Sequence, residues 1–130
     1  AGGIAPLVAL ARDGMDGQKE EAAGALRELA VNADNQVAIV KAGGIPPLVA
    51  LARDGTDGQK WRAAGALWNL AVNDDNQVAI AKAGGIATLV ALARGGTDGQ
   101  KQSATGALRN LACNADNKGG IAPLVALARD

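Results

Sequence analysis

The stretch NQVAIVKAGGIPPLVALAR, residues 35–53, decides the fold, because its central Gly-Gly-Ile is one of four copies of that motif in the chain. The copies end at Ile4, Ile45, Ile86 and Ile121, so the intervals between them are 41, 41 and 35 residues. Self-similarity at a fixed period of about 20 to 50 residues is typical of repeat proteins. We therefore predict one repeat domain over residues 1–130, with units at 1–41, 42–82 and 83–118 and a partial unit at 119–130.

The last interval is shorter than the others because a block of six residues is absent after Lys118. At this place the earlier units carry VAIVKA, residues 37–42, and VAIAKA, residues 78–83. Two explanations are open. Either the gene lacks the block, or a disordered segment is left out of the sequence.

The second unit predicts three helices. Pro46 and Pro47 suit the first turn of a helix of about ten residues that stops at Gly55. The sequence TDGQ, residues 56–59, fits a capping box and opens the longest helix, which we expect to run to about Asn73. Residues 74–82 begin with Asp-x-x-Gln and predict a third, short helix. Helices this short are marginal in isolation, so stacking of the units must stabilise them.

Alanine and leucine mark the buried side of the longest helix. Ala63, Ala66, Leu67, Leu70 and Ala71 recur at helical spacing. Their counterparts are Ala22, Ala25, Leu26, Leu29 and Ala30 in the first unit and Ala104, Ala107, Leu108, Leu111 and Ala112 in the third. The helix before it contributes Leu7, Val8 and Leu10, Leu48, Val49 and Leu51, and Leu89, Val90 and Leu92 to the same core.

Composition excludes several function classes. Thirteen basic and thirteen acidic residues cancel, so the chain lacks the basic surface of a nucleic-acid binder. With no histidine and Cys113 as the only cysteine, we predict no catalytic residues, no metal site and no cofactor, and we do not expect an enzyme. Cys113 replaces Val31 and Val72, which predicts a small core or half-buried residue.

Two features that the sequence lacks bear on where the protein is located. No apolar run approaches the roughly 20 residues that span a bilayer, and no signal peptide is recognisable. We therefore expect no membrane partner, and a reducing compartment, the cytoplasm or nucleus, is favoured.

The period and two sequence stretches resemble the armadillo repeat family over essentially the whole chain. Residues 35–53 look like the family's first and second helices, and AAGALWNLAVN, residues 63–73, looks like its third. The similarity is greatest to plant and algal armadillo arrays, and the glycine-turned short helix favours this family over HEAT repeats. The resemblance implies an all-α, right-handed α-solenoid of three-helix repeats, whose third helices line a concave groove for extended peptides.

The resemblance also implies roles for individual residues. In the family, an asparagine near the end of each third helix pairs with the peptide backbone, and Asn69 and Asn110 occupy that position. The first unit departs from the pattern with Glu28. The family's groove tryptophan is replaced by Gly24, Gly65 and Gly106, so pockets for long basic side chains are not supported.

Differences between equivalent positions on the third helix indicate the surface that is free to bind. The differing sets are Glu20, Trp61 and Gln102; Glu21, Arg62 and Ser103; Arg27, Trp68 and Arg109; and Glu28, Asn69 and Asn110. We expect these sets to lie on one face, opposite the alanine and leucine stripe. The candidate groove residues are Glu20, Arg27, Glu28, Trp61, Arg62, Trp68, Asn69, Gln102, Arg109 and Asn110.

Each candidate role has an alternative. Trp61 and Trp68 are residue types that often dominate binding energy, but one or both rings could instead cover the helix around Gly65. Asn69 and Asn110 could bond to a neighbouring helix instead of to a ligand. Because the first unit's set is net acidic, a ligand should place a basic residue over it.

Two functions follow. The leading hypothesis is a scaffold that binds an extended peptide or protein segment. The alternative is a designed or excised repeat fragment that self-associates and has no native ligand. The chain begins and ends on the apolar sequence IAPLVALARD without a polar cap, so we predict a homo-oligomer, with the final helix able to exchange between chains.

Overall fold

The computed structural model describes residues 3–113, and these residues form eight α-helices and no strand. The predicted all-α class is therefore confirmed for this part of the chain. The helices are α1 (Ile4–Asp13), α2 (Asp16–Leu29), α3 (Ala33–Lys41), α4 (Ile45–Asp54), α5 (Asp57–Leu70), α6 (Asp74–Lys82), α7 (Gly85–Gly95) and α8 (Asp98–Leu111).

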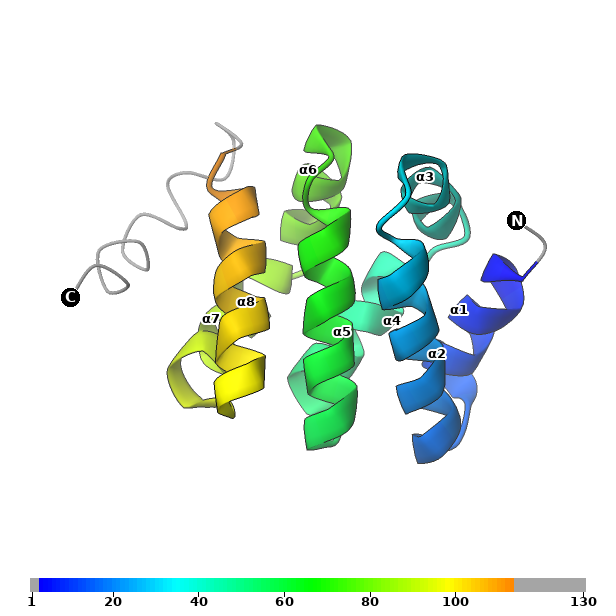
Figure 1. Ribbon diagram of the computed structural model, residues 1–130, viewed down its shortest axis with the longest axis horizontal. Coiled ribbons are helices and arrows are strands. Elements are labelled where there is room, and N and C mark those ends of the chain that lie inside the picture. The colour runs from blue at the N-terminus through cyan, green and yellow to red at the C-terminus, as the bar shows by residue number, and fades with distance from the viewer. Residues whose placement is uncertain (1–2, 114–130) are drawn as a thin grey trace.

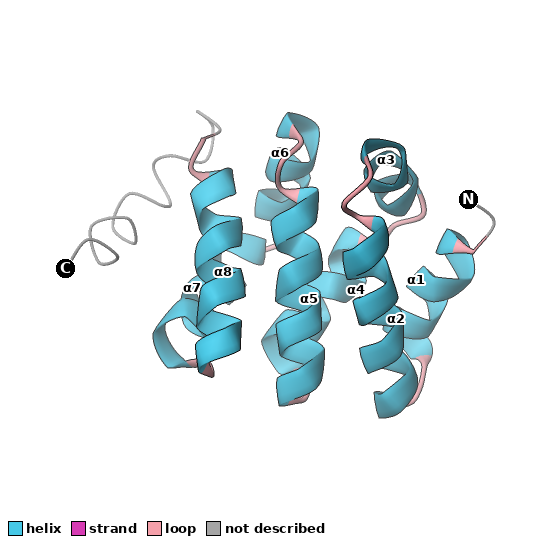
Figure 2. Cartoon of the chain, in the orientation of Figure 1, coloured by secondary structure: helices cyan, strands magenta, loops and turns pink. Residues whose placement is uncertain are grey.

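The helices are arranged as a repeating stack. Figure 1 shows α2, α5 and α8 side by side, with α1, α4 and α7 in a second layer behind them. The short helices α3 and α6 lie at one end of these layers, and Figure 2 shows that only short loops join the elements. The second helices α1, α4 and α7 and the third helices α2, α5 and α8 thus each pack against their counterparts in the next unit, as expected of a solenoid.

The local signals fix where most helices begin. Thr56 Oγ1 accepts a hydrogen bond from Gln59 N at 3.2 Å, and Gln59 Oε1 accepts one from Thr56 N at 3.0 Å, which is the predicted capping box. In the first unit Met15 has no hydroxyl group, so only its backbone N–H takes part, donating to Gln18 Oε1 at 2.9 Å. α4 runs from Ile45 to Asp54 with proline in its first turn, as the sequence predicts.

The longest helix is shorter than expected. α5 ends at Leu70 and not near Asn73. Asn73 is extended, with φ −95° and ψ 131°, and its side chain accepts a hydrogen bond from Asn76 N, so it caps α6. Gln77, the last residue of the Asp-x-x-Gln sequence at the start of α6, donates from Nε2 to Ala71 O at 2.8 Å. These bonds satisfy the end of one helix and the start of the next at the same turn.

Paired glycines make the turn between α3 and α4, and again between α6 and α7. Gly43 and Gly84 have φ of +79° and +84°, a conformation that residues with a Cβ rarely adopt. Gly44 leaves no space for a side chain, since an added Cβ would lie 2.6 Å from Ile39 Cγ2. The recurrent Gly-Gly-Ile of the sequence therefore serves a tight turn followed by close helix packing.

The alanine and leucine stripe forms the core in the second unit, as predicted. Five predicted core residues in the other units are only half-buried: Leu7, Ala25, Leu29, Val90 and Ala112. Ala63, Ala66, Leu67, Leu70 and Ala71 have no exposed surface. Burying a leucine side chain contributes roughly 1.5 to 3 kcal/mol, so this stripe supplies much of the stability of the stack. The small alanines let neighbouring helices approach closely.

Leu10 departs from the predicted core because its side chain is 39% exposed. Its counterparts Leu51 and Leu92 are each only 5% exposed. Both counterparts face the unit before their own, whereas no described helix stacks in front of α1. Burial at this position is therefore a product of stacking, not of the helix itself.

Glutamines tie successive units together. Gln59 Nε2 donates to Asp16 O at 2.9 Å, and 41 residues later Gln100 Nε2 donates to Asp57 O, also at 2.9 Å. The capping glutamine of each of these two helices therefore also bonds to the start of the preceding third helix. Such bonds fix the vertical register between α2, α5 and α8.

Several expectations fall outside the described residues. They are the Gly-Gly-Ile copy at 119–121, the missing block after Lys118, the partial unit 119–130 and the exchange of the final helix. The division into units stays a prediction from the sequence.

Candidate functional site

The outward side of α2, α5 and α8, which we call the ladder face, carries the residues singled out by the sequence. Trp61 and Trp68 are two helical turns apart and project from the same side of α5. Trp61 is 39% exposed and Trp68 is half-buried. None of the ten predicted groove residues is buried: Glu28, Trp61, Gln102 and Arg109 are exposed, and Glu20, Arg27, Arg62, Trp68, Asn69 and Asn110 are half-buried.

Arginine and tryptophan side chains interlock between α2 and α5. The guanidinium carbon of Arg27 lies 4.9 Å from the centre of the Trp61 ring, and that of Arg62 lies 5.9 Å from it. Both distances are within the range of cation–π attraction. Trp61 thus contacts an arginine of α2 and one of its own helix, which orients the indole.

Arg62 also forms an ion pair across the same helices. Its Nε lies 3.7 Å from Glu20 Oε2, and the two side chains are 36% and 39% exposed. The Nε atom is buried and has no hydrogen-bond partner among the described residues. A pair this exposed is worth about 0.2 to 1 kcal/mol, so it positions the arginine more than it stabilises the fold.

The glycines that replace the family's groove tryptophan receive long side chains from neighbouring units. The Arg62 side chain occupies the space beside Gly24, and the Arg27 side chain occupies the space beside Gly65. Beside Gly106 the ring of Trp68 takes the same place. A Cβ at any of these glycines would overlap the side chain packed against it, so each glycine makes a notch for its neighbour.

The sequence left open that a tryptophan ring covers a helix at a glycine, and Trp68 does so with one difference. The ring does cover a glycine-thinned helix, but the glycine is Gly106 of the next unit and not Gly65 of its own. Trp61 lies in the same way beside Gly99, where an added Cβ would be 3.2 Å from Trp61 Cδ1. Both rings therefore lean across the gap from α5 to α8 while keeping part of their surface exposed.

A shallow pocket of about 460 Å³ lies beside the Trp68 ring. Three of its lining residues, Lys101, Thr105 and Gly106, are not among the predicted groove residues. Differences between units could not indicate Lys101, because the equivalent residues Lys19 and Lys60 are also lysines. Thr105 replaces Ala23 and Ala64, a difference that the sequence already contained. The lining residues are Trp68, Lys101, Gln102, Thr105, Gly106 and Arg109.

The two asparagines bridge adjacent third helices. Asn69 Nδ2 donates to Arg27 O at 2.8 Å, and Asn110 Nδ2 donates to Trp68 O at 3.2 Å. This is the second role that the sequence left open. Each bond uses one of the two N–H groups of the amide, and the other N–H and the carbonyl oxygen have no further hydrogen bond within residues 3–113.

Ser103 corrects the expectation that all differing positions are exposed, because it is buried with 3% of its surface accessible. Its counterpart Arg62 turns toward the preceding third helix, where it meets Gly24. This position faces the gap between units and not the solvent. A short serine can be enclosed there, whereas an arginine must extend along the surface.

Cys113 is exposed, although a core or half-buried site was expected. Its counterparts Val31 and Val72 are 74% and 60% exposed. All three follow the last residue of a third helix by two positions, in the turn, where the side chain points away from the stack.

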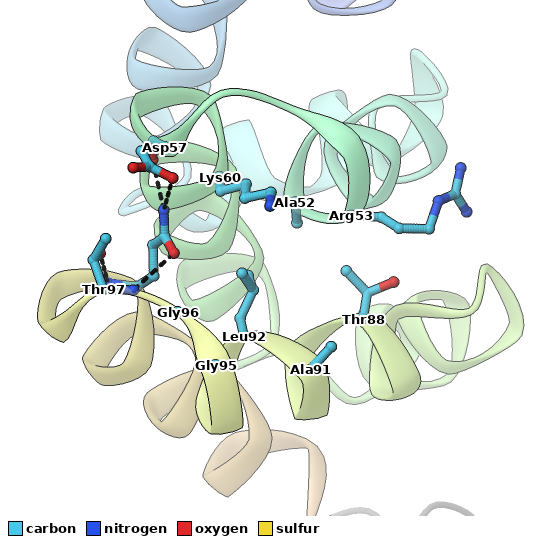
Figure 3. A pocket seen from close by; sticks show the side chains of 11 residues that line it. Ala52, Arg53, Asp57, Lys60, Thr88, Ala91, Leu92, Gly95, Gly96 and Thr97 are labelled. Carbon is cyan, nitrogen blue, oxygen red and sulfur yellow. Dashed lines mark hydrogen bonds between the residues drawn. The ribbon is translucent and has the colours of Figure 1, made fainter.

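A second kind of hollow repeats at the edge where second and third helices meet. Figure 3 shows the one between units two and three, with Asp57, Lys60 and Arg53 on one side and Thr97, Leu92 and Thr88 on the other. Gln100 Nε2 donates to Asp57 O, and Gln100 Oε1 accepts from Thr97 N. The volume of this hollow is about 440 Å³, and an equivalent hollow of about 290 Å³ lies between units one and two. Since the inter-unit glutamine lines both, these hollows are gaps of the stacking geometry.

The described residues hold no group of three or more histidine, cysteine, aspartate or glutamate side chains placed to bind a metal ion. Within the same range no single helix is long and apolar enough to cross a membrane. α6 and α7 meet that criterion only as a pair bent by 83°.

Comparison with known proteins identifies the repeat. The model of the armadillo/beta-catenin-like repeat matches residues 32–72 and 73–113, so it begins each unit at the short helix instead of at the Gly-Gly-Ile turn. A search of curated proteins gives no match.

Designed and engineered proteins are among the similar solved structures. One is a designed armadillo repeat protein in complex with the peptide (KR)4, with 28% identity and a TM-score of 0.87 over 99% of this chain and 58% of that one. An engineered protein has 34% identity and a TM-score of 0.83 over 88% of this chain and 47% of the other. A computationally designed armadillo repeat protein for modular peptide recognition shares the fold, with 23% identity and a TM-score of 0.86 over 98% of this chain and 57% of that one. The chain therefore spans about half the length of these proteins.

Proposed function

The chain belongs to the armadillo repeat family, and from this premise we propose that its ladder face binds an extended peptide or an extended segment of a protein. The observation that carries the proposal is the set of side chains on α5. Trp61 and Trp68 project from one side of that helix with part of each ring exposed, and Asn69 directly follows the second ring. Tryptophans that are already oriented lose little side-chain entropy on binding and often dominate binding energy.

The asparagines supply hydrogen bonds for a peptide backbone. After bonding to Arg27 O, the Asn69 amide has one N–H and its carbonyl left, and the same holds for Asn110 after its bond to Trp68 O. Helices in contact lie about 8 to 10 Å apart, and three residues of a strand span about 10 Å. Successive asparagines therefore suit backbone groups about three residues apart in the ligand.

The comparisons support this class of ligand. One similar structure is a designed armadillo protein in complex with the peptide (KR)4, and another is designed for modular peptide recognition. The surface here differs from a face suited to basic peptides alone, because Arg27, Arg62 and Arg109 lie along it.

The proposal is tested by selecting peptides of about twelve residues from a random library against the full chain and measuring the affinity of synthetic copies. We expect Trp61→Ala to weaken the selected peptides by about tenfold, because it removes an oriented ring. Leu10→Ala is the matched control, since Leu10 is also 39% exposed but lies on α1. Circular dichroism checks that both variants stay helical. Unchanged affinity of every selected peptide for Trp61→Ala would remove the ladder face as the binding site.

The second candidate function is a self-associating repeat fragment without a ligand. The exposed apolar side chains of the first unit favour it, since Leu10 is 39% and Met15 78% exposed. A second copy stacked in front of α1 would cover Leu10 as the preceding units cover Leu51 and Leu92. Light scattering over a dilution series separates the two: a monomer at every concentration rejects self-association, and Leu10→Glu should dissociate any oligomer built on this surface.

A further inference from the structure

We infer that the ladder face distinguishes ligands by charge, with an acidic side chain of the ligand in the Trp68 pocket and a basic side chain over α2. This inference rests on the proposed function, because it assumes that an extended segment lies along the face. It names the charge pattern of that segment.

The charges of the three third helices differ along the stack. α2 carries four acidic and two basic residues, whereas α5 and α8 each carry two basic residues and one acidic. The chain as a whole has a net charge of zero. A preference for a charged ligand must therefore come from this local distribution and not from a general attraction.

Two arginines of the face, Arg27 and Arg62, already have partners within it. Arg62 is paired with Glu20, and Arg27 lies against Trp61 while filling the notch at Gly65. These arginines are committed to holding α2 and α5 together. Glu28 on α2 and Arg109 on α8 differ from these arginines, because both are exposed and have no ion pair among the described residues.

The Trp68 pocket has the composition of an acid-binding subsite. Lys101 and Arg109 line it, no acidic residue does, and Gln102 and Thr105 add polar side chains to its wall. The one acidic residue of α8, Asp98, lies in the first turn and does not line the pocket. A carboxylate there can accept charge-assisted hydrogen bonds from Arg109 and Lys101 while its methylene groups rest on the indole.

The spacing of the helices sets the spacing of charges in the ligand. α2 and α8 are two inter-helix distances apart, which is roughly 16 to 20 Å. An extended chain rises about 3.3 Å per residue, so the basic and the acidic side chain should be about five or six residues apart. A segment of eight residues is long enough to carry both.

Three synthetic octapeptides test the inference on the full chain: (KR)4, KRKREDED and EDEDKRKR. The two mixed peptides differ only in the direction of their charges. We expect one of them to bind at least about fivefold more tightly than both (KR)4 and its reversed partner, because only one direction can match both ends of the face. The advantage should shrink at high ionic strength, since the charges involved are exposed.

Charge-reversal variants of the protein provide a second test of the inference. Arg109→Glu should abolish the advantage of the mixed peptide over (KR)4. Arg94→Glu changes the net charge by the same amount at an exposed position of α7, behind the face, and should leave the preference unchanged. Neither side chain is buried, so both variants should fold.

The outcomes separate this inference from the proposed function. If (KR)4 binds as well as or better than both mixed peptides and Trp61→Ala weakens it, the ladder face binds peptides but the acidic subsite is wrong. If no octapeptide binds and library selection also yields no ligand that depends on Trp61, both proposals are wrong. A preference for one mixed peptide that Arg109→Glu removes and Arg94→Glu does not supports the acidic subsite.

Discussion

Arg27 of α2 lies across the indole of Trp61 on α5, with its guanidinium carbon 4.9 Å from the ring centre, and the same side chain fills the notch at Gly65. One residue thereby joins two units and orients a ring on the ladder face. This contact connects stability and binding, because a change at either residue affects both the stack and the surface that it presents.

The contact between Arg27 and Trp61 should be measurable as a coupling energy. In a double-mutant cycle with Arg27→Ala and Trp61→Ala, we expect about 0.5 to 1 kcal/mol of coupling in urea unfolding, the size of an exposed cation–π contact. The two single variants together should cost more than the double variant. Additive effects would show that the stacked arrangement contributes nothing to stability.

The notch glycines should respond unequally to alanine. Alanine favours the helix over glycine by about 1 kcal/mol, but a Cβ at Gly24 or Gly106 overlaps a neighbouring side chain. At Gly24 the neighbour is the end of the flexible Arg62 side chain, which can move. At Gly106 it is the rigid ring of Trp68. We therefore expect Gly24→Ala to raise the free energy of unfolding. The free energy of unfolding of the Gly106→Ala variant should be about 1 kcal/mol lower than that of the Gly24→Ala variant.

The Trp68→Ala background supplies the control for this comparison. Without the ring, Gly106→Ala should become as favourable as Gly24→Ala, as read from urea unfolding midpoints. If Gly106→Ala is equally favourable whether or not the ring is present, Trp68 does not occupy the notch in solution.

Replacing Gln100 by glutamate should lower the free energy of unfolding more than the same replacement at Gln18, its counterpart in the first unit. Gln100→Glu keeps the oxygen that accepts from Thr97 N but loses the donor to Asp57 O, and it places a carboxylate near Asp57 Oδ1, which is 3.4 Å from Gln100 Nε2. We expect a loss of about 2 kcal/mol in the free energy of unfolding, because the part-buried bond to the Asp57 carbonyl is lost and like charges meet.

Gln18→Glu is the matched control for that substitution. Gln18 occupies the same position of the unit and accepts from Met15 N at 2.9 Å, but it is exposed and makes no bond to another unit. Its replacement should change stability by less than about 0.5 kcal/mol. Equal effects of the two substitutions would mean that the bond to Asp57 does not hold the units in register.

Asn69 should stabilise the fold through the hydrogen bond that its side chain donates to Arg27 O. Asn69→Ala removes the 2.8 Å bond to Arg27 O and should cost about 1 kcal/mol in thermal or urea unfolding. Asn69→Asp should cost more, because a carboxylate oxygen would then face the Arg27 carbonyl. If Asn69→Asp is as stable as the native chain, the amide does not bridge the helices.

The features that the sequence predicts correctly depend on residues within one unit. The period of 41 residues, the capping box at Thr56 and the alanine and leucine stripe each depend on neighbours along the chain, and all correspond to observed features. The sequence predicts that α5 runs to about Asn73, three residues beyond its observed end, whereas the Asn73 side chain caps the next helix. Short-range polar signals at a helix end can serve either neighbour.

The amino-acid sequence by itself determined the repeat, the helices and the side of each helix that is buried, because hydrophobic periodicity and capping act over a few residues. The tertiary structure decided what the outward residues do. Trp68 covers Gly106, Asn69 bonds to Arg27 O and Ser103 is enclosed, and each outcome depends on the register between helices about 40 residues apart. That register is set by close packing of whole helices, which no local pattern specifies.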